Sequence, residues 1–563
     1  MKTKLILLSA AAGLLLTTSC SSKLGALSAD YFNVTPNPLE AETGEVPATI
    51  NGLFPEKYMK KKAVVTVTPE LRFKTDAGIQ SVRGTSATFQ GEKVLGNDQT
   101  ISYLLGGRYS MKTNFKYQPE MQQSDLYLTF DAKIGKKQVE VPDVKVATGV
   151  IATSELYKQT MTTAQMATAQ DAFQRITEQK LDANIKFLIG QAQLRQSELK
   201  NNSVQEFVRL LNDIAKDQEG LMLNNVEVSA YASPDGGYDI NEKLAAKRED
   251  VTGKYVSGEM KKAKADGHID TKYTAEDWEG FQQLVAASNI QDKDVILRVL
   301  SMYKDPEERE AQIRKISSAF RELADGILPQ LRRSRLIANY EIIGRSDDQI
   351  KEQLNADASK LSIEEILYAA NLYSNDPAKA EQTYKKATQL FPNDARAFNN
   401  LAMLAYEKGD YDQAKQWAQK ALNINKNLPE ANANLGMLSL LTGDTNTAES
   451  LISKGTNANG ANEVLGNLHL AQGKYAQAEQ DFKGIQSNSA ALAQILNKNY
   501  QAAASTLKNI KTPDGMTDYL TAIVNVRMGN KAAAQQALKS AIAKDPSLAE
   551  KAAKDLELMS ISK

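Results

Sequence analysis

Two side chains that could hold an anion lie in the middle of the chain, within residues 226–251 (VEVSAYASPDGGYDINEKLAAKREDV). This segment consists of a short alternating apolar run, a Pro-Asp-Gly-Gly turn and a helical pattern, which predicts a strand, a turn and a helix. On the predicted helix Asn241 and Arg248 are two turns apart, so they lie close in angle at the rim of the apolar stripe. An arginine and an amide in this arrangement can bind an anion. They can equally be an arginine whose head group extends into water and a hydrated amide.

The helix that carries them is expected to begin at Asp239, because Glu242 follows three residues later and completes a capping-box pattern. Four apolar residues recur at the helical period and predict the buried face, namely Ile240, Leu244, Val251 and Tyr255. Arg248 is then expected at the edge of that face.

The segment resembles the signature of OmpA-like domains, the peptidoglycan-associated family. Five residues stand at the matching spacings, namely Tyr231, Asn241, Leu244, Arg248 and Val251. The resemblance implies an α/β domain in which an aspartate and an arginine hold the two ends of a diamino acid from the peptidoglycan stem peptide. In this chain Ser233 takes the place of the aspartate, and Asp235 lies two residues further on.

The resemblance therefore predicts a ligand pocket formed by Ser233, Asp235, Asn241 and Arg248. With serine in place of the aspartate, this pocket lacks a charge-assisted bond to the ammonium group of the ligand. Such a bond contributes about 1.5–3 kcal/mol, or roughly ten- to a hundredfold in affinity. Asp235 could supply the missing bond from the turn. We expect peptidoglycan binding to be weak or lost, and the fold to serve as an interaction module.

Residues 172–345 carry the pattern of one α/β domain around this segment. The predicted elements are strands within 172–190, an amphipathic helix at 203–217, the strand–turn–helix described above and a last strand at 332–343. Helices within about 279–330 are predicted to form an insertion before the last strand. Arg332, Arg333 and Arg335 make a small basic cluster that could hold a phosphate or carboxylate, although a solvated strand edge is the more common meaning.

Residues 30–153 predict an all-β domain, most simply a sandwich. Their apolar runs are rich in Val, Thr and Tyr, and turn residues such as those at 96–98 (GND) separate them, with no helical period of useful length. The polar segment 154–171, rich in Thr, Ala and Gln, is predicted to be a connection or a loosely packed helix.

A sequence repeat occupies the chain from Leu361 onward. Hexapeptides with glycine first and alanine sixth recur as GDYDQA (409–414), GDTNTA (443–448), GKYAQA (473–478) and GNKAAA (529–534), with a degenerate copy KNYQAA (498–503). Asn-Leu-Ala (400–402) and Asn-Leu-Gly (434–436) are separated by the same interval as the first two hexapeptides. The pattern resembles the tetratricopeptide repeat, a helix-turn-helix unit of about 34 residues, and predicts an α-solenoid over residues 361–563.

The resemblance implies a concave groove that is lined by the first helix of each repeat and binds peptides or helices. The residues expected to face it are Arg396, Asn399, Met403 and Tyr406 in one repeat and Glu463 and Asn467 in a later one. Each can also be an ordinary polar surface residue. The expected ligands of the groove are proteins of the cell envelope.

The N-terminus has the features of an export signal. Within residues 1–19, Lys2 and Lys4 precede an apolar run at 5–16 that is too short to span a bilayer. The small residues before Cys20 resemble a bacterial lipoprotein processing site, which implies a lipid on Cys20 and a tether over residues 20–29. An ordinary cleaved signal with an incidental cysteine is the alternative.

Composition excludes several classes of function. Lys plus Arg and Asp plus Glu both number 68, which leaves no basic field for nucleic acid. The only histidines are His268 and His469, and Cys20 is the only cysteine, so no metal site of the Cys/His type is expected. No Gly-x-Ser-x-Gly elbow, Walker loop or His-Glu-x-x-His motif occurs, and no cofactor is expected. A glycosidase that acts on the wall polymer stays open as an alternative, because it needs only two carboxylates.

Together these patterns predict a multidomain, non-enzymatic scaffold that is anchored by lipid in the outer membrane, faces the periplasm and binds envelope proteins. The first alternative is a peptidoglycan-binding anchor between the outer membrane and the wall. The second is a surface-exposed lipoprotein whose β domain binds an external ligand.

Overall fold

The computed structural model describes residues 23–290, 292–315 and 321–561. The chain divides into two units, one made of Met1–Gln170 and Pro377–Lys563 and the other of Asp171–Asp376. The predicted signal and Cys20 lie outside the described residues. In the ranges that are described, no helix combines the length and the apolar character needed to cross a bilayer.

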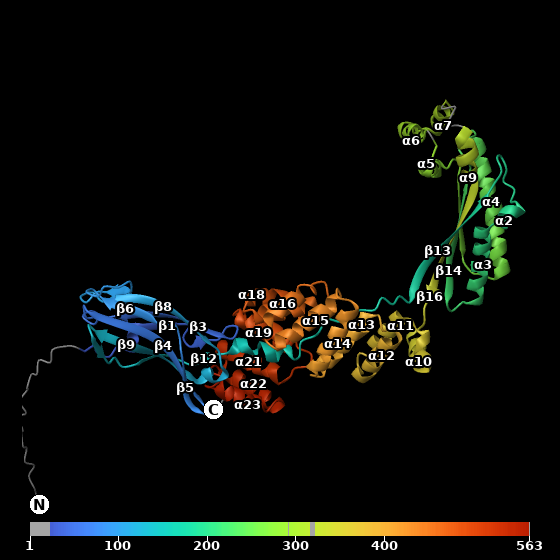
Figure 1. Ribbon diagram of the computed structural model, residues 1–563. Helices are drawn as coiled ribbons and strands as arrows, with labels where there is room; N and C mark the ends of the chain where they lie inside the picture. Colours follow the sequence, from blue (N-terminus) through green and yellow to red (C-terminus); the bar gives the residue numbers. More distant parts are fainter. Residues whose placement is uncertain (1–22, 291, 316–320, 562–563) are drawn as a thin grey trace, which may run out of the picture. The chain divides into compact units, whose positions relative to one another are not determined.

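The N-terminal part of the first unit is built from strands (Figure 1, blue). They are β1 (Phe32–Thr35), β2 (Leu39–Glu40), β3 (Glu45–Phe54), β4 (Ala63–Thr75), β5 (Gly78–Arg83), β6 (Ala87–Gly91), β7 (Gln99–Ile101), β8 (Gly107–Lys116), β9 (Ser124–Ile134), β10 (Lys137–Val139), β11 (Val144–Thr148) and β12 (Val150–Ile151). One sheet has the order β1-β3-β8, and another has β10-β9-β4-β6-β7 with β5 also paired to β4 and β11 to β9. Alternate residues of β3 and β4 point into a core shared by the two sheets. The prediction of an N-terminal β-rich region is confirmed.

The chain enters this core earlier than the sequence indicates. Leu24 and Leu27 are only 4% and 6% exposed and belong to the same buried cluster as the strands. The tether expected over residues 20–29 is therefore too long, because burying two leucines favours packing from Leu24 onward.

The C-terminal part of the first unit is helical (Figure 1, orange to red). Its helices are α12 (Pro377–Leu390), α13 (Ala395–Glu407), α14 (Tyr411–Ile424), α15 (Pro429–Leu441), α16 (Thr445–Ile452), α17 (Ala461–Ala471), α18 (Tyr475–Asp481), α19 (Asn488–Leu496), α20 (Tyr500–Lys508), α21 (Gly515–Arg527), α22 (Lys531–Lys544) and α23 (Leu548–Lys554). From α13 to α22 consecutive helices pack as pairs, each joined by a short turn.

The repeated hexapeptide explains these turns. The glycine at its first position has a positive φ, of +77° at Gly409 and +82° at Gly443. Glycine adopts this backbone conformation without strain, whereas a residue with a Cβ does not. In the degenerate copy Lys498 adopts the same conformation, with φ of +64°. The alanine at the sixth position is fully buried in every copy, as at Ala414 and Ala448, where the two helices of a pair approach.

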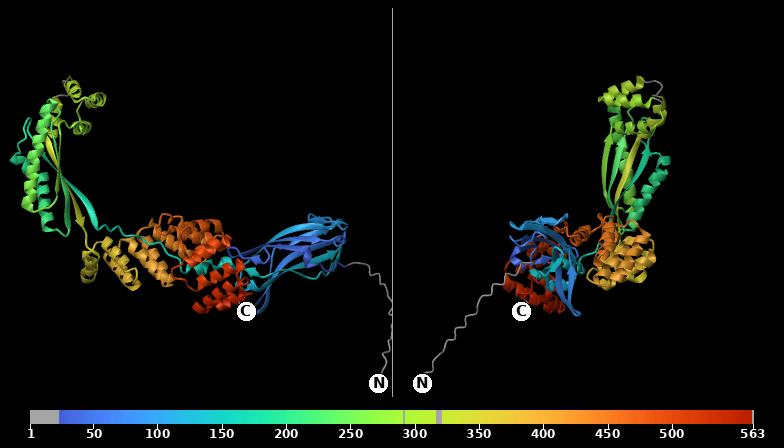
Figure 2. Two further views of the ribbon diagram at one scale, coloured as in Figure 1. Left: turned by 180° about the vertical axis from the view of Figure 1, so that it is seen from behind. Right: turned by 60° about the vertical axis from the view of Figure 1, so that its left-hand side comes forward.

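The second unit contains a four-stranded mixed sheet (Figure 1, green to yellow). Its elements are β13 (Ile176–Lys186), α2 (Gln196–Leu199), α3 (Asn202–Lys216), β14 (Leu221–Tyr231), α4 (Tyr238–Ala263), β15 (His268–Thr274), α5 (Trp278–Ala287), α6 (Lys293–Met302), α7 (Pro306–Lys315), α9 (Leu328–Leu331), β16 (Arg333–Ile343), α10 (Asp347–Asp357) and α11 (Ile363–Leu372). The strand order is β13-β16-β14-β15, with β14 and β15 parallel and the other pairs antiparallel. Helices α3 and α4 pack on the sheet, and α5, α6, α7 and α9 lie between β15 and β16 in the chain, where the sequence predicts an insertion (Figure 2).

Helix α4 differs from its prediction in two respects. It begins at Tyr238 after Gly237, and no side chain caps it, so the Asp239 capping box is absent. Its buried residues are Asn241, Ala245, Arg248, Thr252, Val256 and Met260, whereas Ile240 is 68% exposed. The buried face mixes apolar and polar side chains, and the polar ones are hydrogen-bonded inside the domain, as in the bond of 2.9 Å between the hydroxyls of Thr252 and Ser334. The apolar stripe therefore predicted the buried face only in part, because Val251 and Tyr255 pack against the core whereas Ile240 does not.

Candidate functional site

The helical array buries an unusual set of polar side chains on its first helices. They are Asn399 and Asn400 on α13, Asn434 on α15, Glu463 and Asn467 on α17, and Asn488 and Ser489 on α19. Buried polar groups need hydrogen-bond partners, so a surface of this kind must be covered by something polar.

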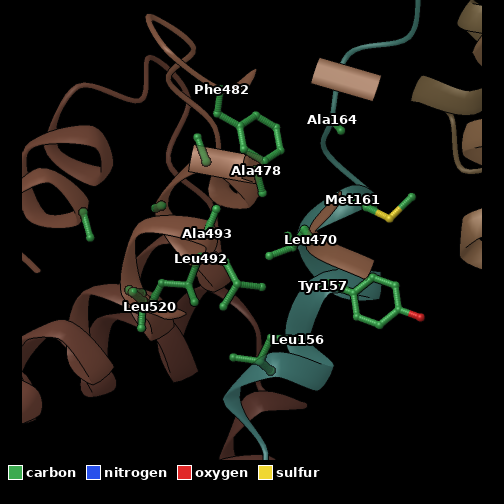
Figure 3. Packing of buried hydrophobic residues seen from close by; sticks show 14 of the residues in the cluster. Leu156, Tyr157, Met161, Ala164, Leu470, Ala478, Phe482, Leu492, Ala493 and Leu520 are labelled. Carbon is green, nitrogen blue, oxygen red and sulfur yellow. The ribbon is translucent and has the colours of Figure 1, made fainter. Parts of the chain in front are cut away.

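The cover is a segment of the same chain, Thr153–Gln170, here called the strap. The strap begins with a short turn of helix at Thr153–Leu156, continues as α1 (Tyr157–Met161) and then runs without regular structure. Its apolar residues are buried among those of the array, as Figure 3 shows for Leu156, Tyr157, Met161 and Ala164 beside Leu470 and Leu492. The predicted connection at 154–171 is thus part of the core of this unit.

Two asparagines bind the main chain of the strap at Ala167. The amide N–H of Ala167 donates to Oδ1 of Asn434 at 2.7 Å, and Nδ2 of Asn434 donates back to the carbonyl of Ala167 at 2.7 Å. Nδ2 of Asn399 donates to the same carbonyl at 3.0 Å, and Asn434 donates to Oδ1 of Asn399 at 2.9 Å. The two amides therefore satisfy each other and the main chain of Ala167.

A third asparagine repeats this contact two residues further along. The N–H of Ala169 donates to Oδ1 of Asn400 at 2.9 Å, and Nδ2 of Asn400 donates to the carbonyl of Ala169 at 2.9 Å. A spacing of two residues is that of an extended chain whose alternate residues face the same surface. The groove thus recognises extended main chain, and the alanines leave room for the helices to approach it.

The other residues predicted for this part of the groove also face the strap. The hydroxyl of Tyr406 donates to the carbonyl of Met161, and Nη1 of Arg396 donates to that of Gln170 at 3.4 Å. The sulfur of Met403 accepts from the hydroxyl of Thr168 at 3.1 Å. These side chains lie along one groove, and the ligand they contact is the chain itself.

Glu463 and Asn467 lie further along the array, on α17, and are also buried. Glu463 accepts hydrogen bonds from the main chain of Gln165 and the hydroxyl of Ser487, yet burial raises the pKa of its carboxyl group to about 7. Nδ2 of Asn467 donates to the carbonyl of Glu463 at 2.9 Å. Oε1 of Glu463 and Oδ1 of Asn467 are buried without a hydrogen-bond partner among the described groups.

A cavity of about 960 Å³ lies beside Glu463. Gln165 and Met166 of the strap line one side, and Glu463 and Asn488 of the array line another. The strap therefore fills the asparagine positions and leaves an adjacent part of the groove open.

The pocket predicted in the second unit has a different character. Arg248 is fully buried and donates to the carbonyls of Leu188 (3.2 Å), Gln191 (2.9 Å) and Tyr231 (2.8 Å). Its guanidinium carbon lies 5.0 Å from the ring centre of Phe187. Burial, and secondarily the charge of Arg332, lowers the pKa of this guanidinium to about 10. The expectation of an arginine at the rim of the helix is wrong, because all three nitrogens serve the fold.

The remaining pocket residues are also satisfied internally. Asp235 pairs with Arg332 at 2.7 Å, and the hydroxyl of Ser233 accepts from Arg332 at 3.1 Å and donates to Asp235 at 2.6 Å. Nδ2 of Asn241 donates to the carbonyl of Gly236 at 2.8 Å. The structure brings Ser233 and Asp235 together around the guanidinium of Arg332, a cation of the protein itself.

The basic cluster at the start of β16 is ion-paired. Arg332 pairs with Asp235, as above, and Arg333 pairs with Asp277 at 3.1 Å. The side chains of these two arginines are only 11% and 21% exposed, so the solvated strand edge predicted for them is wrong. The Arg335 side chain, 45% exposed, pairs with Asp182.

Comparison with protein families decides the nature of the helical region. Residues 370–432 match the family model of the tetratricopeptide repeat. The C-terminal region is an array of tetratricopeptide repeats. Such repeats are protein–protein interaction modules, so a scaffold role for this region follows from the fold. The strap, Asn400 and Asn434 escaped the sequence prediction, although Asn400 and Asn434 each begin a copy of the Asn-Leu motif in successive repeats.

Several solved structures are similar to parts of this chain. A tetratricopeptide repeat protein from Parabacteroides merdae is 16% identical, covering 38% of this chain and 91% of that chain with a TM-score of 0.28. The type IV pilus biogenesis factor PilW is 19% identical, covering 35% and 96% with a TM-score of 0.27. PilF of Pseudomonas aeruginosa is 15% identical, covering 38% and 98% with a TM-score of 0.27. No curated protein matches the chain.

Proposed function

We propose that the protein is a non-enzymatic scaffold of a bacterial cell envelope, attached to the outer membrane through a lipid on Cys20 and facing the periplasm. Its tetratricopeptide array assembles other envelope proteins. The observation that carries the proposal is the contact of Asn399, Asn400 and Asn434 with the main chain of the strap. A surface that binds main chain in this manner is suited to extended peptides of varied sequence.

The site for a partner is the open part of the groove beside the strap. There Glu463 lines the cavity, which is large enough for several residues of an extended peptide. Peptide N–H groups are donors that fit its carboxyl oxygens.

Photo-crosslinking in intact cells tests this site. A photoreactive residue at Gln486, which is exposed and lines the cavity, is expected to crosslink to another envelope protein. The same residue at Lys420, exposed on the second helix of an earlier repeat, is the matched control and is expected to give no such product. Identical products at both positions would reject the groove as the partner site.

The second unit is proposed to be a divergent OmpA-like domain that serves as an interaction module. Its strands and helices follow the order β-α-β-α-β, and after inserted helices a last strand lies between the first two in the sheet. Arg332 neutralises Asp235, and three main-chain carbonyls accept hydrogen bonds from Arg248. Neither Asp235 nor Arg248 is therefore free to hold a diamino acid. Sedimentation with purified peptidoglycan is expected to leave the protein in solution. Low-micromolar binding that is lost in Arg248→Lys, with the fold intact, would favour the wall-anchor alternative.

The lipid anchor has its own test. Growth with labelled palmitate is expected to label the protein, and Cys20→Ala is expected to abolish both the label and recovery with the outer membrane. Label that persists in the variant would exclude Cys20 as the attachment site.

A further inference from the structure

Three leucines at one end of the β-rich region lie outside its core. Leu95 is 102% exposed, Leu104 is 62% exposed and Leu105 is 82% exposed. Exposed apolar side chains grouped at the tip of a domain indicate a surface that meets a protein or a membrane.

The turn that carries two of them is held in place. The N–H of Gly106 donates to the carbonyl of Ser102 at 3.0 Å, and the carbonyl of Tyr103 accepts from the N–H of Lys57 at 2.6 Å. The hydroxyl of Ser102 donates to Glu92 at 2.9 Å. Gly106 has a φ of +71°, and a Cβ there would lie 2.3 Å from the carbonyl oxygen of Phe54. Leu104 and Leu105 are thus presented by a built turn.

Basic residues outnumber acidic ones in the segments that carry these leucines and pack beside them. The segments 55–62 and 92–106, which form this end of the domain, contain five lysines and three carboxylates. The ammonium of Lys60 lies 5.1 Å from the ring centre of Tyr103, and the N–H of Lys93 donates to the carbonyl of Lys61 at 2.7 Å. Exposed leucines beside lysines match an anionic bilayer surface, because the apolar side chains can enter the headgroup region and the ammonium groups are attracted to the anionic headgroups.

The chain enters the domain at this same end. The hydroxyl of Tyr58 donates to the carbonyl of Gly25 at 2.9 Å, and Leu24 and Leu27 are buried in the β core. Cys20 precedes Leu24 by only four positions, a stretch of chain that spans at most about 14 Å when fully extended. A lipid on Cys20 would therefore hold this end of the domain at the membrane surface.

We propose that Leu95 and the turn at residues 102–106 insert into the headgroup region of the anionic bilayer to which Cys20 is anchored. The inference rests on the lipid anchor of the proposed function. The leucines and lysines give the β-rich region a second contact with the membrane, so that the domain is held against the lipid surface in one orientation.

The test uses the full-length protein in vesicles that contain phosphatidylglycerol. A polarity-sensitive fluorophore is attached to Leu105→Cys or to the control Ile79→Cys. Ile79 is 82% exposed and lies at the hairpin between β4 and β5. Strand β4 has 13 residues, so this hairpin is roughly 40 Å from the end of β4 that follows residues 55–62. The acylated thiol of Cys20 cannot react, so the dye labels the new cysteine alone.

The dye at position 105 is expected to shift to the blue and to lose most of its emission to quenchers placed in the lipid headgroup region, whereas the dye at position 79 is unchanged. Equal emission at the two positions, with Cys20 shown by mass to be acylated, would overturn the inference and leave the anchor intact. An unmodified Cys20 thiol in the protein from the native envelope would overturn the anchor itself and the inference with it.

Discussion

The groove of the tetratricopeptide array and the polar pocket of the Asp171–Asp376 unit both bury polar side chains, but they satisfy them differently. In the groove Asn399, Asn400 and Asn434 bind the main chain of a segment that is distant in the sequence. In the pocket Arg248 binds carbonyls of its own domain. A polar surface that contacts a separable segment can exchange that ligand for another, whereas one whose bonds all lie within its own domain can only support the fold.

The largest effect on stability is expected from a substitution in the pocket. Arg248→Ala removes a buried side chain and leaves three carbonyls without donors, which should lower the free energy of unfolding of the second unit by about 3–5 kcal/mol. Denaturant unfolding measures this loss. Arg335→Ala, whose ion pair is largely exposed, is the control and should cost less than about 1 kcal/mol. Equal stability of Arg248→Ala and the parent would show that this arginine is free for a ligand.

A smaller effect is expected from the groove. Asn434→Ala removes both bonds to Ala167 and should weaken strap binding by about 1–3 kcal/mol. Limited proteolysis should then cut within residues 162–170, which stay protected in the parent. Asn432→Ala is the matched control, because Asn432 is buried on the same helix but bonds only to Lys426 and Leu428 of the array. Cleavage in both variants would mean that the array, rather than its contact with the strap, was damaged.

Glu463 adds a pH dependence that the pocket should lack. Burial raises the pKa of its carboxyl from 4.5 to about 7, so the closed strap holds a proton that the opened form releases. Strap closure should be strongest below about pH 4.5, should weaken as the pH rises to about 7 and should then stay constant. The hydrogen-exchange rate of the Gln165 amide, corrected at each pH for the intrinsic exchange rate, measures this change in strap closure. Glu463→Gln should flatten the profile, and an unchanged profile would assign the titration to another group.

The smallest effect is expected from substitutions in the turns of the array. These variants test whether the stability of the array is separate from strap binding. Lys498→Gly relieves a positive φ and should stabilise the array by about 0.5–1 kcal/mol. Gly409→Ala, where an added Cβ meets nothing within 4 Å, should destabilise it by about 1 kcal/mol through the backbone alone. Thermal unfolding gives both values. Altered strap proteolysis in either variant would show that turn strain and strap binding are coupled.

The sequence predicted the repeat array well because its period, turn glycines and buried alanines are local signals that recur, as at Gly409 and Ala414. The β-rich region was predicted from alternation for the same reason. The strap was missed because its burial depends on Asn399 and Asn434, which follow Ala167 in the sequence only after the whole Asp171–Asp376 unit. Nothing in a Thr- and Ala-rich stretch indicates such a contact.

The buried face of α4 was predicted only in part, for a related physical reason. Hydrophobic periodicity identifies a buried face only when burial is apolar. Here Arg248 and Thr252 are buried because the loop between β13 and α2 and strand β16 supply their partners. Likewise, the charges of Arg332 and Asp235 are far apart in the sequence, and only the fold shows that they neutralise each other.

The central claim is that the asparagines of the groove hold the strap as a peptide ligand. Hydrogen exchange at the amides of Ala167 and Ala169 in the full-length protein tests it most directly. These amides donate to Asn434 and Asn400, and they lie in a segment without secondary structure of its own. We predict protection comparable to that of the buried helices of the array, lost at Ala167 in Asn434→Ala. Exchange at both amides as fast as in an exposed loop would contradict the claim.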